Sequence, residues 1–370
     1  MDDFNERYNR QLILGGFGEK AQRALEAARV LVIGAGGLGC PVLQYLAAAG
    51  VGTIGIIDHD SVALSNLHRQ VLFTTADIGL LKAEVASKKL SALNPPVKIN
   101  TYPFQLDPIN AVQLISEYDY VVDGSDNFST RYLVNDVCVF LGKPLVYGAV
   151  SEYEGQVAVF NVIQNGASIN YRDLFPLQPG EGEFLNCAEA GALGVLPGII
   201  GSMQAAETIK LITGTGEPLI NRMLTYNLLI QEIFTIELQA GNPDSYRIPA
   251  SAGEFAATDY GEGCRMPIAM ADGEVEEITR EQRDQAILNH GATVIDVREE
   301  SETPPLAGVQ YIQIPMSVFP VFAAGIEGDP VILFCQSGIR SIIAAELLAA
   351  AYPAKEYYSL KGGISRLTIR

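Results

Sequence analysis

Short apolar runs alternate with amphipathic segments through the first 150 residues. The apolar runs predict strands, and segments with apolar residues at helical spacing predict helices. Strands are expected at 30–33, 53–58, 97–104, 118–127 and 143–150, and helices at 1–28, 38–50, 76–93, 108–117 and 129–142. This alternation predicts an α/β fold with a doubly wound, Rossmann-like parallel sheet.

The pattern changes after residue 150. Segments 155–163, 222–229 and 231–238 are expected to be strands that pair antiparallel, with an apolar helix at 198–213. Residues 241–275 are rich in small and polar residues with little periodicity, which is typical of a linker. A new strand–helix pattern begins near residue 276. The prediction is therefore a first domain at 1–240, a linker at 241–275 and a small α/β domain at 276–370.

The chain is acidic, with a formal net charge of −18. Such a surface repels phosphate backbones and anionic lipids, so nucleic acid and membrane are poor partners. No apolar run reaches the roughly 18 residues of a membrane span, and the N-terminus is too polar for a signal peptide. The 5 cysteines are scattered, which fits reduced thiols in a cytoplasmic protein.

A glycine loop after the first predicted strand indicates a nucleotide site. Gly34, Gly36 and Gly39 form the pattern G-x-G-x-x-G between a strand and a helix. Backbone N–H groups and a helix N-terminus attract phosphate at such a turn. Asp58 ends the next strand, where an acid would meet ribose hydroxyls. These residues alone fit an NAD-dependent oxidoreductase as well as an ATP-using enzyme.

Charged residues at the same sheet edge favour ATP. Arg69 lies past the second strand, Lys82 near the start of the next helix, and Asp126 past a later strand. Two cations and an acid at the carboxyl edge of a sheet suit a triphosphate with Mg²⁺. Hydride transfer needs no such cluster.

Five separated motifs together resemble the ubiquitin-activating (E1-like) superfamily: GAGGLGC at 34–40, Asp58, SNLHRQ at 65–70, Lys82 and DGSDN at 123–127. The resemblance covers about residues 4–238. It implies that ATP is bound by Gly34, Gly36, Gly37, Gly39, Asp58, Ser65, Asn66, Arg69, Lys82, Asp126 and Asn127, with Asp126 also positioning Mg²⁺. It further implies a homodimer in which Arg10 reaches the partner subunit's site.

The implied reaction activates a carboxylate, which is by itself a poor electrophile. Attack of the carboxylate on the α-phosphorus of ATP expels pyrophosphate and leaves an acyl-adenylate, and Arg10, Arg69, Lys82 and Mg²⁺ would offset the accumulating charge. Similar enzymes act on a ubiquitin-like sulfur-carrier protein that ends in Gly-Gly. Two alternatives remain: an NAD-dependent oxidoreductase, and E1-like adenylation of a different carboxylate.

Cys187 matches a cysteine of the family's mobile loop, which in some relatives binds the activated carrier covalently. A functional role and a bystander role are both open. Most relatives also bind a structural zinc through two Cys-x-x-Cys pairs. Here Asn170 and Asp173 stand at the first pair, and the second pair is absent near 242–247, so no zinc is expected.

Cys335 lies between an apolar run and a helix, with Arg340 at the end of the loop. A thiolate there is stabilised by loop N–H groups and the helix N-terminus. Four residues separate Cys335 from Arg340, one fewer than in phosphatases, and the tighter loop suits a single sulfur atom. Together with 296–299 and 360–364, this loop resembles the rhodanese sulfurtransferases.

The fusion of the two domains implies a persulfide on Cys335 that attacks the acyl-adenylate and leaves the carrier as a thiocarboxylate. A thiol such as Cys187 would resolve the intermediate, and a donor such as a cysteine desulfurase would supply the sulfur. The pathway that uses the product, whether molybdopterin, thiamine, cysteine or tRNA thiolation, remains open.

Overall fold

The computed structural model describes residues 3–178, 191, 193–242, 245–260, 276–298, 309–315, 328–336, 339–352 and 355–364. Contacts divide the chain into two units, 1–178 with 185–264 and 179–184 with 265–370. The described part of the expected linker belongs to the first unit, because Phe255 of α10 (Ala252–Ala257) is buried in that unit's core. The domain boundaries at 240 and 276 stay a prediction.

The first unit is built on one sheet, which has 8 strands in the described residues, in the order β3-β2-β1-β4-β5-β6-β7-β8. Their bounds are β1 Arg29–Ile33, β2 Thr53–Ile57, β3 Lys98–Tyr102, β4 Tyr120–Asp123, β5 Leu145–Ser151, β6 Glu154–Phe160, β7 Arg222–Asn227 and β8 Glu232–Glu237. Strands β1 to β5 are parallel, and β6 to β8 are antiparallel. The predicted doubly wound sheet with an antiparallel extension is confirmed.

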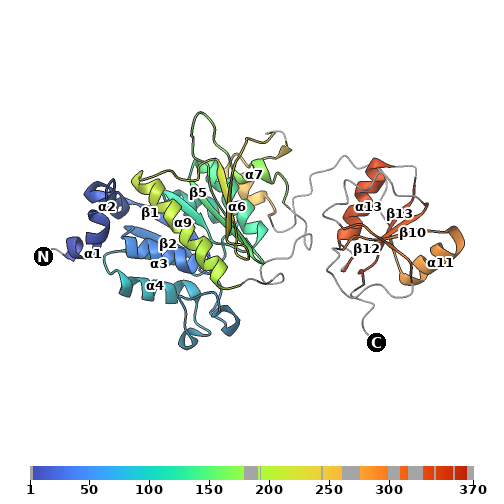
Figure 1. The fold of residues 1–370 in the computed structure, drawn as a ribbon, viewed down its shortest axis with the longest axis horizontal. Helices are drawn as coiled ribbons and strands as arrows, with labels where there is room; N and C mark the ends of the chain where they lie inside the picture. Colours follow the sequence, from blue (N-terminus) through green and yellow to red (C-terminus); the bar gives the residue numbers. More distant parts are fainter. Residues whose placement is uncertain are drawn as a thin grey trace. The chain divides into compact units, whose positions relative to one another are not determined.

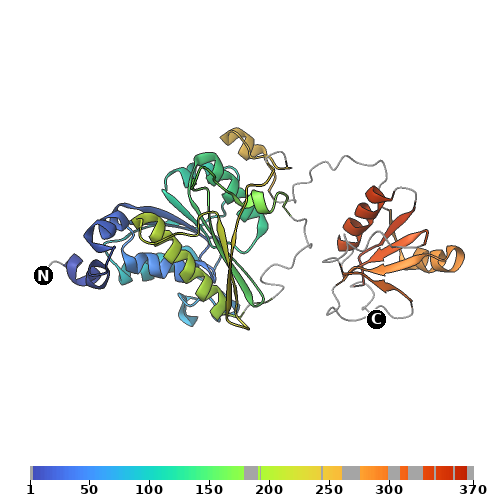
Figure 2. The ribbon, with the colours of Figure 1, turned by 45° about the horizontal axis from the view of Figure 1, so that its top comes forward.

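Helices cover both faces of this sheet (Figures 1 and 2). One face packs against α2 (Gly18–Ala27), α3 (Gly39–Ala49), α4 (Lys82–Leu93) and α9 (Val195–Thr213), the other against α5 (Ala111–Ser116), α6 (Phe128–Leu141) and α7 (Tyr171–Leu174). Both faces are apolar because successive strand residues point to opposite sides: Val30 joins the first core and Leu31 the second. In the described part, no helix combines the length and the apolar character needed to cross a bilayer.

The order of strands reverses between β1 and β4, which is where open α/β sheets bind ligands. The chain leaves β1 at Gly34 and β4 at Gly124, and these two turns touch. A Cβ on Gly34 would lie 2.9 Å from the Gly124 carbonyl oxygen, and Gly34 has a φ of +88°. Only glycine fits this position without strain, so the two loops can meet at the carboxyl edge.

In the second unit, the described residues form a parallel sheet of 5 strands in the order β11-β10-β12-β13-β9. The strands are β9 Glu276–Ile278, β10 Thr293–Asp296, β11 Ile312–Gln313, β12 Val331–Phe334 and β13 Tyr357–Leu360. Helix α13 (Ile339–Ala351) packs on one core and α11 (Arg280–His290) on the other, through Leu348 and Ile287. This is the small α/β unit that the sequence predicts.

Candidate active sites

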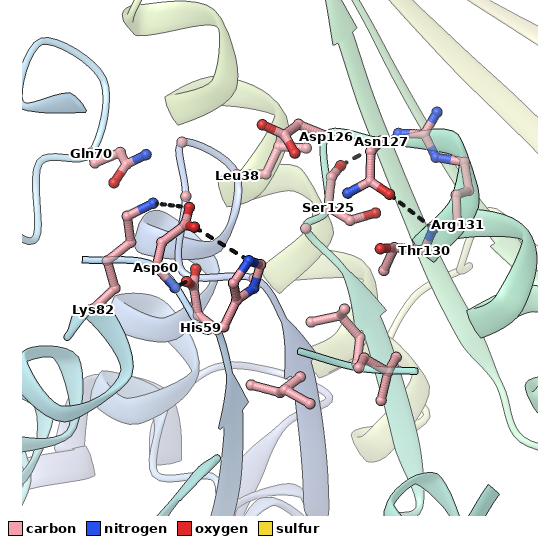
Figure 3. Close-up of a pocket in the computed structure, with 18 of the residues that line it drawn as sticks. Leu38, His59, Asp60, Gln70, Lys82, Ser125, Asp126, Asn127, Thr130 and Arg131 are labelled. Carbon is pink, nitrogen blue, oxygen red and sulfur yellow. Dashed lines mark hydrogen bonds and ion pairs between the residues drawn. The ribbon is translucent and has the colours of Figure 1, made fainter. Parts of the chain in front are cut away.

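A pocket in the first unit lies where β1, β2 and β4 end (Figure 3). Its wall brings together eight residues of the predicted nucleotide set: Gly34, Gly36, Gly37, Asp58, Arg69, Lys82, Asp126 and Asn127. Further residues of the wall were not among the predicted site residues: Leu38, His59, Asp60, Gln70, Phe104, Gln105, Leu106, Ser125, Thr130, Arg131, Val150 and Pro197. The glycine loop borders the pocket, with Lys82 and Asp60 on one side and Asp126 and Arg131 on the other (Figure 3).

Asp58 links the glycine loop to the end of β2. Its Oδ2 accepts a hydrogen bond from the Ala35 N–H at 2.7 Å, and its Oδ1 accepts one from the Asp60 N–H at 2.8 Å. Burial raises the pKa of Asp58, and the nearby Lys82 and the Ala35 N–H oppose that rise. The carboxylate thus stands at the pocket wall next to the glycine loop.

Lys82 begins α4 and is only 4% exposed. Its Nζ donates to Asp60 Oδ2 at 2.8 Å. Burial alone would raise the pKa of Asp60, but the hydrogen bond and the charge of Lys82 lower it overall. Lys82 is therefore held at the pocket wall by the Asp60 carboxylate.

Arg69 also lines the pocket. Its Nη1 donates to the Ser65 carbonyl at 3.1 Å and lies 2.8 Å from His68 Nε2. A Cβ on Gly37 would lie 3.6 Å from Arg69 Cδ, so the arginine side chain runs beside the glycine loop.

The loop after β4 carries Asp126, and a buried carboxylate shapes it. Asp123 is fully buried, and its Oδ1 accepts from both the N–H and the hydroxyl of Ser125, at 2.9 and 2.6 Å. Arg131 donates to Asp123 Oδ2 and to the Ser125 carbonyl, each at 3.4 Å. Burial lowers the pKa of Arg131, but Tyr147 and Asp123 raise it overall.

Asn127 caps the N-terminus of α6, where its Oδ1 accepts from the Thr130 N–H. Asp126, the residue before it, is exposed at the pocket (Figure 3).

Some predicted site residues lie outside this pocket. Arg10 is exposed on α1 (Asp3–Leu12), and Ser65 and Asn66 belong to the short helix η1 (Leu64–Asn66). Asn66 Oδ1 accepts from the Ala63 N–H at 3.1 Å, so its side chain serves the turn. Gly39 lies behind the loop, where a Cβ would meet the Gly34 carbonyl oxygen at 2.0 Å.

Cys187 falls outside the described residues, so its placement is not tested.

Two pocket residues that the sequence analysis did not select could have been found from their spacing in the sequence. Asp60 follows Asp58 by two positions at a strand end, and Arg131 lies one helical turn after Asn127.

Asn170 and Asp173, at the first predicted zinc-pair position, join two segments by hydrogen bonds. Asp173 Oδ2 accepts from the N–H and the side-chain amide of Asn170, both at 2.8 Å. Its Oδ1 accepts from the Tyr246 hydroxyl at 2.9 Å and the Gly241 N–H at 3.0 Å. Among the described residues, no cluster of three or more His, Cys, Asp or Glu could hold a metal. The absence of zinc stays a prediction.

Cys335 leaves the end of β12 and is fully buried. Its Sγ lies 3.6 Å from the Ser341 hydroxyl, which in turn lies 2.8 Å from the Ser359 hydroxyl on β13. Arg340 lies partly exposed in the first turn of α13. The cysteine and the arginine therefore flank one strand-to-helix loop, as the motif predicts; residues 337 and 338 between them are outside the described part.

An ion pair on the neighbouring strand supports the Cys335 loop. Arg298 is 1% exposed and donates from Nη2 to Asp296 Oδ2 at 2.7 Å and from Nε to Asp296 Oδ1 at 3.0 Å. Its Nη1 donates to Gln336 Oε1 at 3.4 Å. The charged pair thus connects β10 to the residue next to Cys335.

Comparison with known proteins identifies the family of this chain. The model of the ThiF family matches residues 8–247. The chain belongs to the ThiF family. It is 53% identical to the "Sulfur carrier protein adenylyltransferase" of Thermus thermophilus, over 60% of the chain and 83% of that protein.

Two relatives match this ThiF-family chain over nearly its whole length. It is 41% identical to the "Probable adenylyltransferase/sulfurtransferase MoeZ" of Mycobacterium tuberculosis, over 97% of the chain and 91% of that protein. It is 37% identical to the "Adenylyltransferase and sulfurtransferase MOCS3" of Drosophila grimshawi, over 98% of the chain and 83% of that protein. The chain is therefore an enzyme that combines adenylyltransferase and sulfurtransferase activities.

A solved structure of E. coli MccB with ATP superposes with a TM-score of 0.56 at 24% identity, covering 66% of the chain and 74% of MccB. That likeness shows the shared fold of the first unit.

Proposed function

We propose that the first unit adenylates the C-terminal Gly-Gly carboxylate of a ubiquitin-like sulfur-carrier protein, and that the second unit supplies sulfur to form a thiocarboxylate. The observation that carries this proposal is the meeting of Lys82, Arg69, Asp126 and the glycine loop in one pocket. The name of the Thermus thermophilus relative, a sulfur-carrier adenylyltransferase, supports a carrier as substrate.

ATP and Mg²⁺ fit the residues of this pocket. The N–H groups of the glycine loop, Arg69 and Lys82 would bind the phosphates, and Asp58 would bind the ribose. Asp126 is an exposed carboxylate on the opposite wall and would hold Mg²⁺ together with the phosphates, since Mg²⁺ sites commonly use one or two carboxylates. Mg²⁺ would offset charge on the phosphate oxygens. The carboxylate substrate is already ionised, so the pocket needs cations and orientation rather than a general base.

Sulfur transfer would begin with a persulfide on Cys335. The terminal sulfur attacks the acyl-adenylate carbonyl, the bond to AMP breaks, and the carrier is held as an acyl disulfide. A second thiol then attacks the Cys335 sulfur, so that a disulfide forms and the thiocarboxylate leaves. Cys187 is our candidate for that thiol, and a cysteine desulfurase is our candidate for the sulfur donor.

We also propose a cytoplasmic homodimer without zinc. Arg10 is exposed and lies outside the pocket of its own chain, so a partner subunit's pocket is available to it. The hydrogen bond from the Tyr246 hydroxyl to Asp173 joins the segments that zinc would otherwise link. Sedimentation and metal analysis of the purified protein test these two points: a monomer, or one zinc per chain, would contradict them.

The main test is exchange of radiolabelled pyrophosphate into ATP. A carrier that ends in Gly-Gly should support exchange, and the same carrier without its last glycine should not. No exchange with any such carrier, together with tight NAD binding, would favour the oxidoreductase alternative. Exchange driven by a different carboxylate would favour the second alternative.

A further inference from the structure

Two serines occupy core positions of the second unit. In α13, Ala344 and Leu348 belong to the core, and Ser341 precedes them on the same face of the helix. In β13, Ser359 lies on the same face of the strand as Tyr357, which belongs to that core as well. Both serines are fully buried, at positions where the pattern of each element predicts an apolar side chain.

The two serine side chains meet next to Cys335. The Ser341 hydroxyl lies 2.8 Å from the Ser359 hydroxyl and donates to Cys335 Sγ at 3.6 Å. Cys335 belongs to the same core and follows β12, which pairs with β13, and α13 packs against both strands (Figure 1). One hydroxyl from the helix and one from the neighbouring strand therefore form a chain that ends on the sulfur atom.

This chain is suited to stabilise a negative charge on the sulfur. A buried thiolate loses more hydration than a buried thiol, so the anion depends on hydrogen-bond donors of the protein. A hydrogen bond to a charged acceptor is about twice as strong as one to a neutral acceptor. Each hydroxyl has one hydrogen. When Ser341 donates its hydrogen to Cys335, the bond between the two serines must therefore use the hydrogen of Ser359.

We propose that Ser341 is a catalytic residue of sulfur transfer whose hydroxyl stabilises the Cys335 thiolate, and that Ser359 is a positioning residue that orients this hydroxyl. The inference rests on the proposed role of Cys335 as the persulfide carrier. In the assisted step, the thiolate attacks the outer sulfur of a sulfane-sulfur donor. The bond from Sγ to that sulfur forms, the donor's bond to the same sulfur breaks, and the electron pair leaves with the rest of the donor.

The first test titrates the Cys335 thiolate in full-length Ser341→Ala and Ser359→Ala. The thiolate is followed by its ultraviolet absorption, and each variant that also carries Cys335→Ala serves as the blank. Removing a donor that favours the charged form raises the pH of the titration midpoint. We expect a rise of about one to two pH units for Ser341→Ala, since a hydrogen bond to a charged group shifts the equilibrium roughly 10- to 100-fold.

Ser359→Ala should raise the midpoint by a smaller amount, because the Ser341 hydroxyl is still present but less well oriented. The double variant should titrate like Ser341→Ala alone, because residues that act through one another are not additive. If the two single shifts add in full, the hydroxyls do not act as one chain and the role of Ser359 is wrong.

Persulfide formation with thiosulfate is the second test, because the thiolate is the reacting form. At a pH below the wild-type midpoint, Ser341→Ala should gain sulfur more slowly by the same roughly 10- to 100-fold. At high pH, where both proteins are ionised, the two rates should approach each other. A rate deficit that is equal at every pH would contradict stabilisation of the thiolate.

Tyr357→Phe is the matched control. It removes a hydroxyl from the same strand, but this hydroxyl donates to the Tyr352 carbonyl at 3.1 Å. The control should lower the unfolding temperature without moving the midpoint. An unchanged midpoint in Ser341→Ala, or an equal shift in Tyr357→Phe, would overturn the inference and leave the proposed function intact. Thiocarboxylate formation by Cys335→Ala would instead overturn the proposed role of Cys335 itself.

Discussion

The glycine loop at 34–39 and the cysteine loop at 335–340 occupy the same kind of strand-to-helix connection but contribute different chemical groups. Each connects the carboxyl end of a parallel strand to a helix, β1 to α3 and β12 to α13. The glycine loop brings backbone close to the pocket, and its charges come from other elements. The cysteine loop carries its own nucleophile, which is fully buried.

The two loops are also supported in comparable ways. A carboxylate at the end of the neighbouring strand supports each loop. Asp58 accepts a hydrogen bond directly from the Ala35 N–H of the glycine loop. Asp296 supports the cysteine loop indirectly, because it binds Arg298, which donates to Gln336. Asp58 borders an open pocket, and Asp296 and Arg298 are almost completely buried. A strand–loop–helix turn can thus admit a large polyanion or enclose one sulfur atom, depending on the side chains around it.

Replacing the nucleophile should separate the two activities most completely. Cys335→Ala should form no carrier thiocarboxylate, because no persulfide can form, while pyrophosphate exchange continues at the wild-type rate. Mass spectrometry of the carrier and the exchange assay measure the two steps. Cys264 lies in the segment 241–275 that the sequence predicts as a linker, so Cys264→Ala is the control and should retain both activities. Normal thiocarboxylate formation by Cys335→Ala would disprove the role of this loop.

Removing the arginine behind the cysteine loop should affect only the second unit. Arg298→Met leaves the Asp296 carboxylate buried and unpaired, which should cost about 3–5 kcal/mol of that unit's stability. Calorimetry should show its transition shifted down while MgATP binding stays unchanged. The double variant with Asp296→Leu should recover much of the loss, because both charges are then gone. If the single variant unfolds like the wild type, the pair does not support the loop.

Removing the buried cation of the nucleotide pocket should affect only adenylation. Lys82→Met should slow pyrophosphate exchange about 100- to 1,000-fold, because a preorganised charge near the phosphates is lost. Loading of Cys335 with persulfide sulfur, measured with radiolabelled sulfur, should be unchanged. Lys82→Arg should retain part of the exchange activity. If Lys82→Met changed the exchange rate only slightly, the phosphates would bind away from Lys82 and the assignment would be wrong.

The smallest effect is expected at Asp58. Asp58→Asn should weaken MgATP binding about tenfold, since a hydrogen bond to a charged acceptor is replaced by a neutral one. Burial raises the pKa of Asp58 above the usual value of about 3.9 for an aspartate. The acceptor is the ionised form, so wild-type affinity should fall as the pH drops towards that raised pKa. Asp58→Asn should show a flatter pH profile in calorimetric titrations; parallel profiles would contradict the assignment.

The fold was largely predictable because its elements depend on local pattern. Buried parallel strands are short apolar runs, so the predicted bounds of β1 and β2 each differ from the observed bounds by one residue. Within the segment expected to be a linker, the packing of Phe255 on the first core is a long-range contact that composition does not reveal.

The candidate site was predictable in part. Gly34, Asp58 and Lys82 follow from strand ends and helix starts, and the structure brings them to one pocket. Asn66 was expected at the nucleotide, but its side chain caps a turn. Gln70 could not be distinguished from its motif neighbours, because only the three-dimensional structure shows that its buried Oε1 lacks a hydrogen-bond partner.

The ion pair between Lys82 and Asp60 has a consequence for turnover. Asp60 accepts from the Lys82 ammonium group at the pocket wall. Under the proposed function, the phosphates of ATP would compete with Asp60 for this ammonium group, and the competition would lower the affinity for the triphosphate. Asp60 would pair with Lys82 again after the bond to pyrophosphate breaks, which would favour release of the leaving group.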